Sequence, residues 1–206
     1  MSHASSHVEP AGAHAGRFDG VVLAASAGGV QALTSLVSQL PAGFPLPIVV
    51  VQHVDAHHRS LLVEILGRRS KLPVEFVEDG ATLRPGTVFI APPGWHVLVN
   101  ADATMSLNQA ERVHFVRPSA DLLFASAAES FADRVIGVVL TGTGEDGANG
   151  VRAVHEMGGT VVVQDEASSD FFGMPQAAIA TGAADFVVAL DEIGDVLVEL
   201  AEGATA

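Results

Sequence analysis

The sequence predicts a single α/β domain built on a doubly wound, mostly parallel, Rossmann-like sheet that carries a small antiparallel β-rich insertion. From residue 18 onward, short β-branched runs alternate with longer segments of helical period, which is typical of βαβ units. The 206 residues, of which 49% are hydrophobic, suffice for one domain with a sizeable core. No apolar run approaches the roughly 20 residues that a membrane-spanning helix needs, so we expect the apolar side chains to build that core.

The expected elements follow from the spacing of the apolar residues. Strand-like runs are expected near 20–25, 47–52, 74–77, 87–91, 96–99, 135–140, 160–163 and 186–188. Segments with helical apolar spacing occupy 28–39, 59–69, 119–132, 145–157, 174–181 and 191–202. Pro118-Ser119 and Asp191 are typical helix starts. The stretch 74–107 has no long helix, and its Pro-Gly turns at 84–86 and 92–94 indicate the antiparallel insertion.

The two ends of the chain are expected to lie outside the folded domain. Residues 1–17 lack the apolar segment of an export signal and predict a disordered tail, 203–206 predict a second tail, and 18–202 form the domain. We therefore expect a cytoplasmic protein without membrane insertion. The absence of cysteine excludes disulfides, thiolate nucleophiles and Cys-bound metals. A formal net charge of −14 argues against nucleic-acid binding.

Three polar residues stand where apolar strand runs give way to loops. Ser26 follows 21–25, His53 follows 48–52, and Asp146 comes shortly after 135–140. Parallel strands of an open α/β sheet bring their carboxyl ends to one edge, where such sheets place their sites. A nucleophile, a base and an orienting acid are the parts of a hydrolytic triad, and the conjunction of all three favours one here.

The segment around Ser26 has the features of a nucleophile elbow. Small residues flank the serine, and Ala27, Gly28 and Gly29 open the next helix, whose N–H groups stabilise an oxyanion. Each polar residue also has a structural interpretation. Ser26 is a common helix cap, a lone histidine at a strand end is more often structural, and Asp146 in a first helical turn offsets the dipole of that helix.

The turn 142–147 also satisfies the dinucleotide-binding fingerprint. Gly142, Gly144 and Gly147 give G-x-G-x-x-G between a strand and a helix, and Asp165 ends the next strand. Two carboxylates in this turn, however, stand where a pyrophosphate would bind. An NAD(P)-binding oxidoreductase is therefore the alternative function.

A histidine-rich segment follows the second expected strand. His53, Asp55, His57 and His58 lie close together in sequence, and histidine and aspartate are zinc ligands. If the segment is a loop, His57 and His58 lie in solvent near a helix start and only His53 points to the site. We therefore expect no metal and no cofactor.

Six short blocks occur along the chain from residue 21 to the last helix. They are Ala-Ser-Ala-Gly-Gly at 25–29, Gln-His at 52–53, Ile-Ala-Pro at 90–92, Arg-Pro-Ser at 117–119, the run 140–147, and Phe-Gly-Met-Pro at 172–175. In identity and order these blocks resemble the catalytic domain of the chemotaxis protein-glutamate methylesterases, which also act as receptor glutamine deamidases. Two features depart from the family pattern: Ala24 replaces a usual glycine, and 108–114 lacks a Gly-Pro element.

The resemblance implies a serine esterase that hydrolyses glutamate γ-methyl esters on methyl-accepting chemotaxis receptors, and it leaves deamidation of glutamines open. It assigns the triad to the serine, histidine and aspartate named above. It also implies that Arg117 lies beside the cleft and that Phe172, Gly173 and Met174 line the substrate entrance. Their structural interpretations are a surface salt-bridge arginine and a helix-starting loop.

The expected partners are the cytoplasmic helices of methylated chemoreceptors. Because the chain is acidic, we expect shape and a local basic group such as Arg117 to provide recognition. Since only residues 1–17 precede the domain, we expect a stand-alone catalytic domain without the family's receiver. A separate response-regulator partner and constitutive activity are both compatible with this expectation. A catalytically idle signalling scaffold of the same fold is a further alternative.

Overall fold

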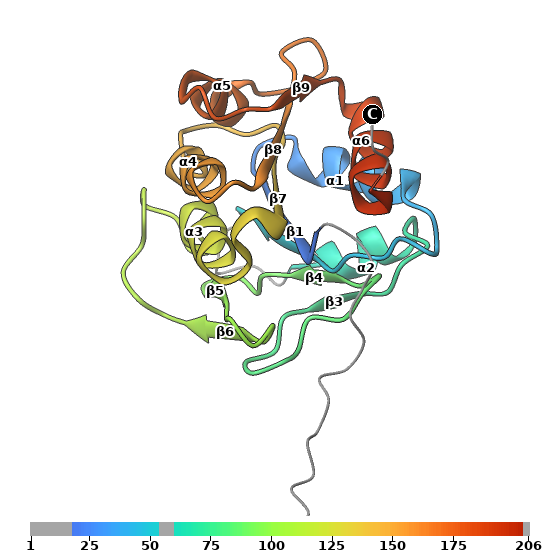
Figure 1. Ribbon diagram of the computed structural model, residues 1–206, viewed down its shortest axis with the longest axis vertical. Helices are drawn as coiled ribbons and strands as arrows, with labels where there is room; N and C mark the ends of the chain where they lie inside the picture. The colour runs from blue at the N-terminus through green and yellow to red at the C-terminus, as the bar shows by residue number, and fades with distance from the viewer. Residues whose placement is uncertain (1–17, 54–59, 204–206) are drawn as a thin grey trace, which may run out of the picture.

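The computed structural model describes residues 18–53 and 60–203, which form a seven-stranded sheet between two layers of helices (Figure 1). The tail expected at 1–17 lies outside the described residues, as do 204–206 of the second tail. The candidate metal ligands Asp55, His57 and His58 also lie outside them. None of the described helices has both the length and the apolar character that crossing a bilayer demands.

The main sheet is parallel throughout and has the order β3-β4-β2-β1-β7-β8-β9. Its strands are β1 (Gly20–Ala25), β2 (Ile48–Gln52), β3 (Val74–Phe76), β4 (Val88–Ile90), β7 (Val135–Val139), β8 (Thr160–Gln164) and β9 (Phe186–Val188). From β1 the chain winds first toward β3 and later toward β9, which confirms the predicted doubly wound α/β fold. The strand order reverses between β1 and β7, and open α/β sheets bind their ligands at this switch point.

The helices cover both faces of the sheet. They are α1 (Gly29–Gln39), α2 (Leu62–Gly67), α3 (Ala120–Phe131), α4 (Ala148–Glu156), α5 (Gly173–Ala180) and α6 (Leu190–Glu202), with a short 3₁₀ turn, η1 (Ala132–Arg134), after α3. Figure 1 shows α3, α4 and α5 on one side of the sheet and α1, α2 and α6 on the other. Two buried clusters match this division, one for each face.

Alternation along the central strands explains the two clusters. In β1, Val22 and Ala24 belong to the cluster under α3 to α5, whereas Val21 and Leu23 belong to the cluster under α1, α2 and α6. Successive side chains of a strand point to opposite faces. A strand that is apolar at every position is therefore buried on both sides, as all-parallel sheets require.

The stretch 74–107 is rich in strands and only part of it is antiparallel. β3 and β4 belong to the main parallel sheet, and the antiparallel part is the pair β5 (His96–Val99) and β6 (Met105–Asn108). The strand β6 was not predicted, because its polar Ser106 and Asn108 interrupt the apolar pattern. The pair packs against α3, where the Ser126 hydroxyl accepts the Val99 N–H at 3.0 Å.

Candidate active site

Ser26 and His53 leave the sheet side by side. β1 and β2 pair with Ala25 opposite Gln52, and the His53 N–H donates to the Ala25 carbonyl at 3.0 Å. On the other side of β1, the Ser26 N–H donates to the Thr141 carbonyl at 3.0 Å. Ser26 therefore stands between the strand end that leads to His53 and the loop that follows β7.

Ser26 lies in the turn before α1 and does not cap that helix. The N-cap is Gly28, with a left-handed φ of 76°, and the Ser26 carbonyl accepts the Gly29 N–H at 2.8 Å. The interpretation of Ser26 as a helix cap is therefore wrong. Within the described residues, no hydrogen bond joins the Ser26 hydroxyl to His53. Catalytic hydrogen bonds often tighten only when substrate binds.

The His53 ring is bound to Asp146. Its Nε2 lies 2.8 Å from Asp146 Oδ2, and only 10% of the histidine side chain and 4% of the aspartate side chain are exposed. With Nε2 donating to the carboxylate, Nδ1 is the ring nitrogen left to accept a proton. The pair thus has the geometry of a base oriented by an acid.

The start of α3 holds Asp146 in place. The carboxylate accepts hydrogen bonds from the Ser119 hydroxyl at 2.8 Å, the Ala120 N–H at 2.6 Å and the Asp121 N–H at 3.2 Å. Ser119 is the N-cap of α3, as predicted. The interpretation of Asp146 as a first-turn acid of the following helix is wrong, because α4 begins only at Ala148 and the carboxylate binds α3 instead.

These hydrogen bonds keep Asp146 ionised. Burial alone raises the pKa of the carboxyl, but the bonds from His53, the Ala120 N–H and the Ser119 hydroxyl outweigh that effect. The pKa of Asp146 therefore lies below its ordinary value. An ionised carboxylate beside the ring stabilises the imidazolium that forms when a histidine takes a proton.

Asp121 does for α4 what Asp146 does for α3. The buried Asp121 carboxylate accepts the N–H groups of Gly147 at 2.9 Å and Gly150 at 2.8 Å, both at the start of α4. The N-terminus of α3 is thus bound by Asp146, which lies just before α4, and the N-terminus of α4 is bound by Asp121, which lies in the first turn of α3. Helix N-termini favour negative charge, so this exchange ties α3 to α4 directly beside His53.

His96 binds the other side of Ser119. The ring is fully buried, Nδ1 accepts the Ser119 N–H at 3.1 Å, and Nε2 lies 3.1 Å from the Glu111 carbonyl. These partners require a neutral ring with its proton on Nε2. Burial lowers the pKa of His96 below its ordinary value, and the charge of Arg117 acts in the same direction. A chain of hydrogen bonds therefore runs from His96 through Ser119 to Asp146.

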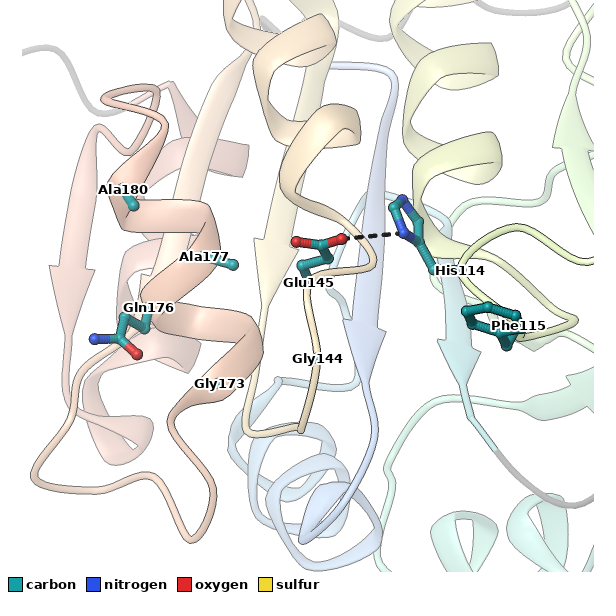
Figure 2. Close-up of a pocket in the computed structure, with 8 residues that line it drawn as sticks. All are labelled: His114, Phe115, Gly144, Glu145, Gly173, Gln176, Ala177 and Ala180. Carbon is teal, nitrogen blue, oxygen red and sulfur yellow. Dashed lines mark ion pairs between the residues drawn. The ribbon is translucent and has the colours of Figure 1, made fainter.

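A groove of about 630 Å³ lies next to these residues. In Figure 2, Gln176 and Ala177 of α5 stand on one side, His114 and Phe115 on the other, and Glu145 between them. Glu145 directly precedes the buried aspartate, so the groove begins at the site. The His114 Nδ1 lies 3.4 Å from the Glu145 carboxylate, which links the side that carries His114 and Phe115 to the residue in the middle of the groove. Phe115 is 92% exposed at the rim of the groove.

A smaller hollow of about 370 Å³ contains Ser26 itself, together with Gly28, Asp170 and Phe171. The segment 170–173 borders both spaces, because Gly173 lines the larger groove. Backbone hydrogen bonds attach this segment to the loop after β7. The serine and the groove are therefore connected through one loop.

The residues expected at the substrate entrance occupy different positions. Gly173 lines the groove, Phe172 is half-buried, and Met174 is buried with its sulfur over Gly142, where a Cβ would overlap it. Arg117 lines neither space: its Nη1 donates to the carbonyls of Gln109 and Ala110 at 2.8 Å each. Arg117 thus braces the loop that carries Phe115, and a direct contact with substrate stays a prediction.

The dinucleotide and metal alternatives gain no support from this geometry. The buried carboxylate of the 142–147 turn is fully engaged by His53 and α3, in the place that a pyrophosphate would need. Among residues 18–53 and 60–203, no cluster of three or more His, Asp or Glu side chains is arranged to hold a metal ion.

Three residues at the site have no role predicted from the sequence, namely Gln52, His96 and Asp121, and Ser119 was predicted only as a helix start. Gln52 and Ser119 stand inside the Gln-His and Arg-Pro-Ser blocks, so the blocks were a signal that went unused. His96 lies outside the six blocks and is fully buried at the start of β5. No sequence pattern points to Asp121, because its partners lie on another helix.

The fold and site together have the features of an α/β hydrolytic enzyme with a doubly wound parallel sheet, because a serine and a histidine–aspartate pair follow neighbouring strands at the carboxyl edge of that sheet. Known proteins give the same answer. Residues 21–197 match the family described as CheB methylesterase. The catalytic domain of the Thermotoga maritima CheB methylesterase has the same fold, with a TM-score of 0.86 at 37% identity, over 89% of this chain and 98% of that one.

Two relatives give the scale of the similarity. A putative protein-glutamate methylesterase/protein-glutamine glutaminase of Leptospira interrogans is 37% identical over 183 residues, 89% of this chain and 95% of the relative. The protein-glutamate methylesterase FrzG of Myxococcus xanthus is 41% identical over 179 residues, 87% of this chain but only 54% of the relative. The chain belongs to the CheB methylesterase family, a family of hydrolases, and nothing in these comparisons supports an oxidoreductase.

Proposed function

We propose that the chain hydrolyses glutamate γ-methyl esters on the cytoplasmic helices of methyl-accepting chemotaxis receptors, with Ser26, His53 and Asp146 as its catalytic triad. The observation that supports this proposal is the His53–Asp146 pair, with Nε2 2.8 Å from the carboxylate, at the sheet edge where Ser26 leaves the neighbouring strand. The membership of the chain in the CheB methylesterase family supports the reaction class.

In the proposed mechanism each group of the triad has one role. His53 Nδ1 takes the proton of the Ser26 hydroxyl as its oxygen attacks the ester carbonyl, and Asp146 stabilises the resulting imidazolium. The proton then passes from the ring to the leaving methoxide, so methanol departs and an acyl-serine remains. Water, deprotonated by the same ring, hydrolyses the acyl-serine to the free glutamate.

The oxyanion donors belong to the turn after Ser26. The Gly29 N–H already donates to the Ser26 carbonyl at 2.8 Å, which leaves the N–H groups of Ala27 and Gly28 as the donors of our proposal. Removing one oxyanion donor typically lowers kcat by about 10²–10³. The left-handed Gly28 fixes the direction of this turn.

The groove beside the site suits one face of a receptor helix. Small residues form part of its lining, namely Gly144, Gly173, Ala177 and Ala180. The exposed Phe115 ring offers an apolar contact at the rim. Shape has to provide most of the recognition, because the chain carries a net charge of −14. In this proposal Arg117 contributes through the loop that it braces.

The same attack on a glutamine side-chain amide releases ammonia and also yields glutamate. Curated relatives carry both names, protein-glutamate methylesterase and protein-glutamine glutaminase. We therefore propose deamidation as the second reaction of this site. A cytoplasmic location and control by a separate response regulator go with this proposal.

Methanol release from a methylated receptor tests the proposal. The wild-type chain is expected to release methanol, and Ser26→Ala to release none while keeping a wild-type circular dichroism spectrum. A fluorophosphonate probe should label Ser26 in the wild type but not in His53→Ala. Wild-type turnover by Ser26→Ala would refute the serine mechanism, and absence of labelling would favour the idle scaffold.

A further inference from the structure

We infer that Gln52 is a positioning residue that holds the nucleophile and the base at a fixed separation, an inference that rests on the proposed triad. Gln52 is the last residue of β2 and is 4% exposed. Its side-chain Nε2 donates to two carbonyls at once, those of Ser26 at 2.8 Å and His53 at 3.0 Å. One amide group thus contacts the backbone of both residues that exchange the proton.

The contact begins where the sheet stops holding the two segments together. The last backbone bond between them is from the His53 N–H to the Ala25 carbonyl. Beyond it, Ser26 turns toward α1, and His53 lies past the end of β2. Past the last backbone hydrogen bond between the two segments, the Gln52 side-chain amide connects them by binding the carbonyls of both Ser26 and His53.

The neighbouring sequence provides the space for this side chain. Gly29, the first residue of α1, lies against it: a Cβ on Gly29 would overlap Gln52 Oε1 and come within 2.8 Å of the Ala25 Cβ. The glycine therefore permits the close approach of helix and glutamine. The Gly29 N–H donates to the same Ser26 carbonyl that Gln52 binds. The Ser26 carbonyl oxygen therefore accepts hydrogen bonds from both the start of α1 and the glutamine.

Stability alone does not explain a glutamine at this position. Gln52 Oε1 is buried and has no hydrogen-bond partner among the described residues. A buried acceptor without a partner is unfavourable. Replacing Gln52 by an apolar side chain of similar shape therefore loses two hydrogen bonds but also removes an unpaired oxygen. We expect Gln52→Met to be close to neutral for folding. The positioning role predicts that its activity falls all the same.

Gln39 provides a matched control away from the site. Its Nε2 lies 3.4 Å from the Leu190 carbonyl and its Oε1 accepts the Gly194 N–H at 3.1 Å, so it joins α1 to α6 with both ends paired. Gln39→Met makes the same chemical change in a bridge that contacts neither Ser26 nor His53. It should lower the melting temperature and leave kcat unchanged.

The test compares Gln52→Met, Gln39→Met and wild type in three measurements: kcat and KM for methanol release, the melting temperature, and the rate of fluorophosphonate labelling at Ser26. For Gln52→Met we expect kcat and the labelling rate to fall at least tenfold, in line with the large loss that a displacement of about 1 Å causes at a reacting centre. KM should stay within about twofold, and the melting temperature within about 4 °C, the shift that roughly 1 kcal/mol produces in a chain of this size.

The outcomes separate this inference from the proposed function. A Gln52→Met protein with wild-type kcat and labelling rate overturns the positioning role, as does a loss confined to KM or one that Gln39→Met shares. If the wild type is labelled at Ser26 but releases no methanol, the proposed substrate is wrong, and the labelling rates still decide the role of Gln52. If Ser26 is not labelled in the wild type, the triad and the positioning role are both refuted.

Discussion

Removing the Ser119 hydroxyl tests the connection between α3 and the buried Asp146. Ser119→Ala deletes a 2.8 Å hydrogen bond to the carboxylate and the side-chain cap that accepts the Leu122 N–H. A hydrogen bond to a charged group is worth about 1.5–3 kcal/mol, and loss of an N-cap costs about 1 kcal/mol. We therefore expect the free energy of unfolding at pH 7 to fall by roughly 2–4 kcal/mol.

The pH dependence makes this prediction specific to the carboxylate. Since the pKa of Asp146 is lowered in the folded state, its hydrogen bonds stabilise the fold above the ordinary carboxyl pKa of about 3.9. This contribution is lost as the pH falls through the folded pKa. The difference in unfolding free energy between wild type and Ser119→Ala should therefore be the same at pH 7 and pH 5 and shrink only below about pH 3.9. Urea titrations followed by circular dichroism at pH 7, 5 and about 3 measure it.

Ser130→Ala is the control, because Ser130 lies on the same helix and donates to the neutral Val99 carbonyl at 3.0 Å. Ser130→Ala should lower the free energy of unfolding by about 0.5–1.5 kcal/mol, and its difference from wild type should not shrink at acidic pH. Equal costs for the two variants at pH 7, or a Ser119→Ala difference that does not change with pH, would refute the argument that the hydroxyl supports an ionised carboxylate.

Two further predictions concern neighbouring groups. Because burial lowers the pKa of His96, its neutral ring stabilises the fold fully above about pH 6.5 and less as the pH falls below that value. His96→Asn, whose Oδ1 can still accept the Ser119 N–H, should flatten the slope of unfolding free energy against pH between 5 and 7. An unchanged slope would contradict the assignment of a neutral, buried ring to His96. Phe115→Ala should change the unfolding free energy by less than about 0.5 kcal/mol, as exposed substitutions do, while raising KM for a methylated receptor; an unchanged KM would remove Phe115 from the proposed docking surface.

The fold was predictable because most of its information is local. Apolar runs bounded by turns gave every strand of the main sheet, and helical spacing gave all six helices to within a few residues. β6 was missed because a half-exposed antiparallel strand with alternating polar residues has little apolar signal. The membership of β3 and β4 in the main sheet could not be predicted, because both strands are short and the local sequence does not show which strands they pair with.

The site was predictable only in part. Strand ends place Ser26, His53 and Asp146 at one edge, because the period of the strands and the topology of the sheet decide where they emerge. The support around them could not be predicted, since it consists of contacts between segments distant in sequence. The exchange of carboxylates between α3 and α4 spans 25 to 29 residues, and the sequence near Asp121 contains no signal for it.

The central position of β1 has a consequence for the assembly of the protein. Ser26 follows β1, which has β2 with His53 at its end on one side and β7, more than 100 residues later in the chain, on the other. A fragment that stops before residue 135 therefore keeps the serine and the histidine but leaves β1 as an apolar edge with unpaired amides, which is a template for aggregation. Esterase activity should consequently appear in refolding only after the C-terminal half has joined the sheet. The return of activity therefore measures the completion of the fold.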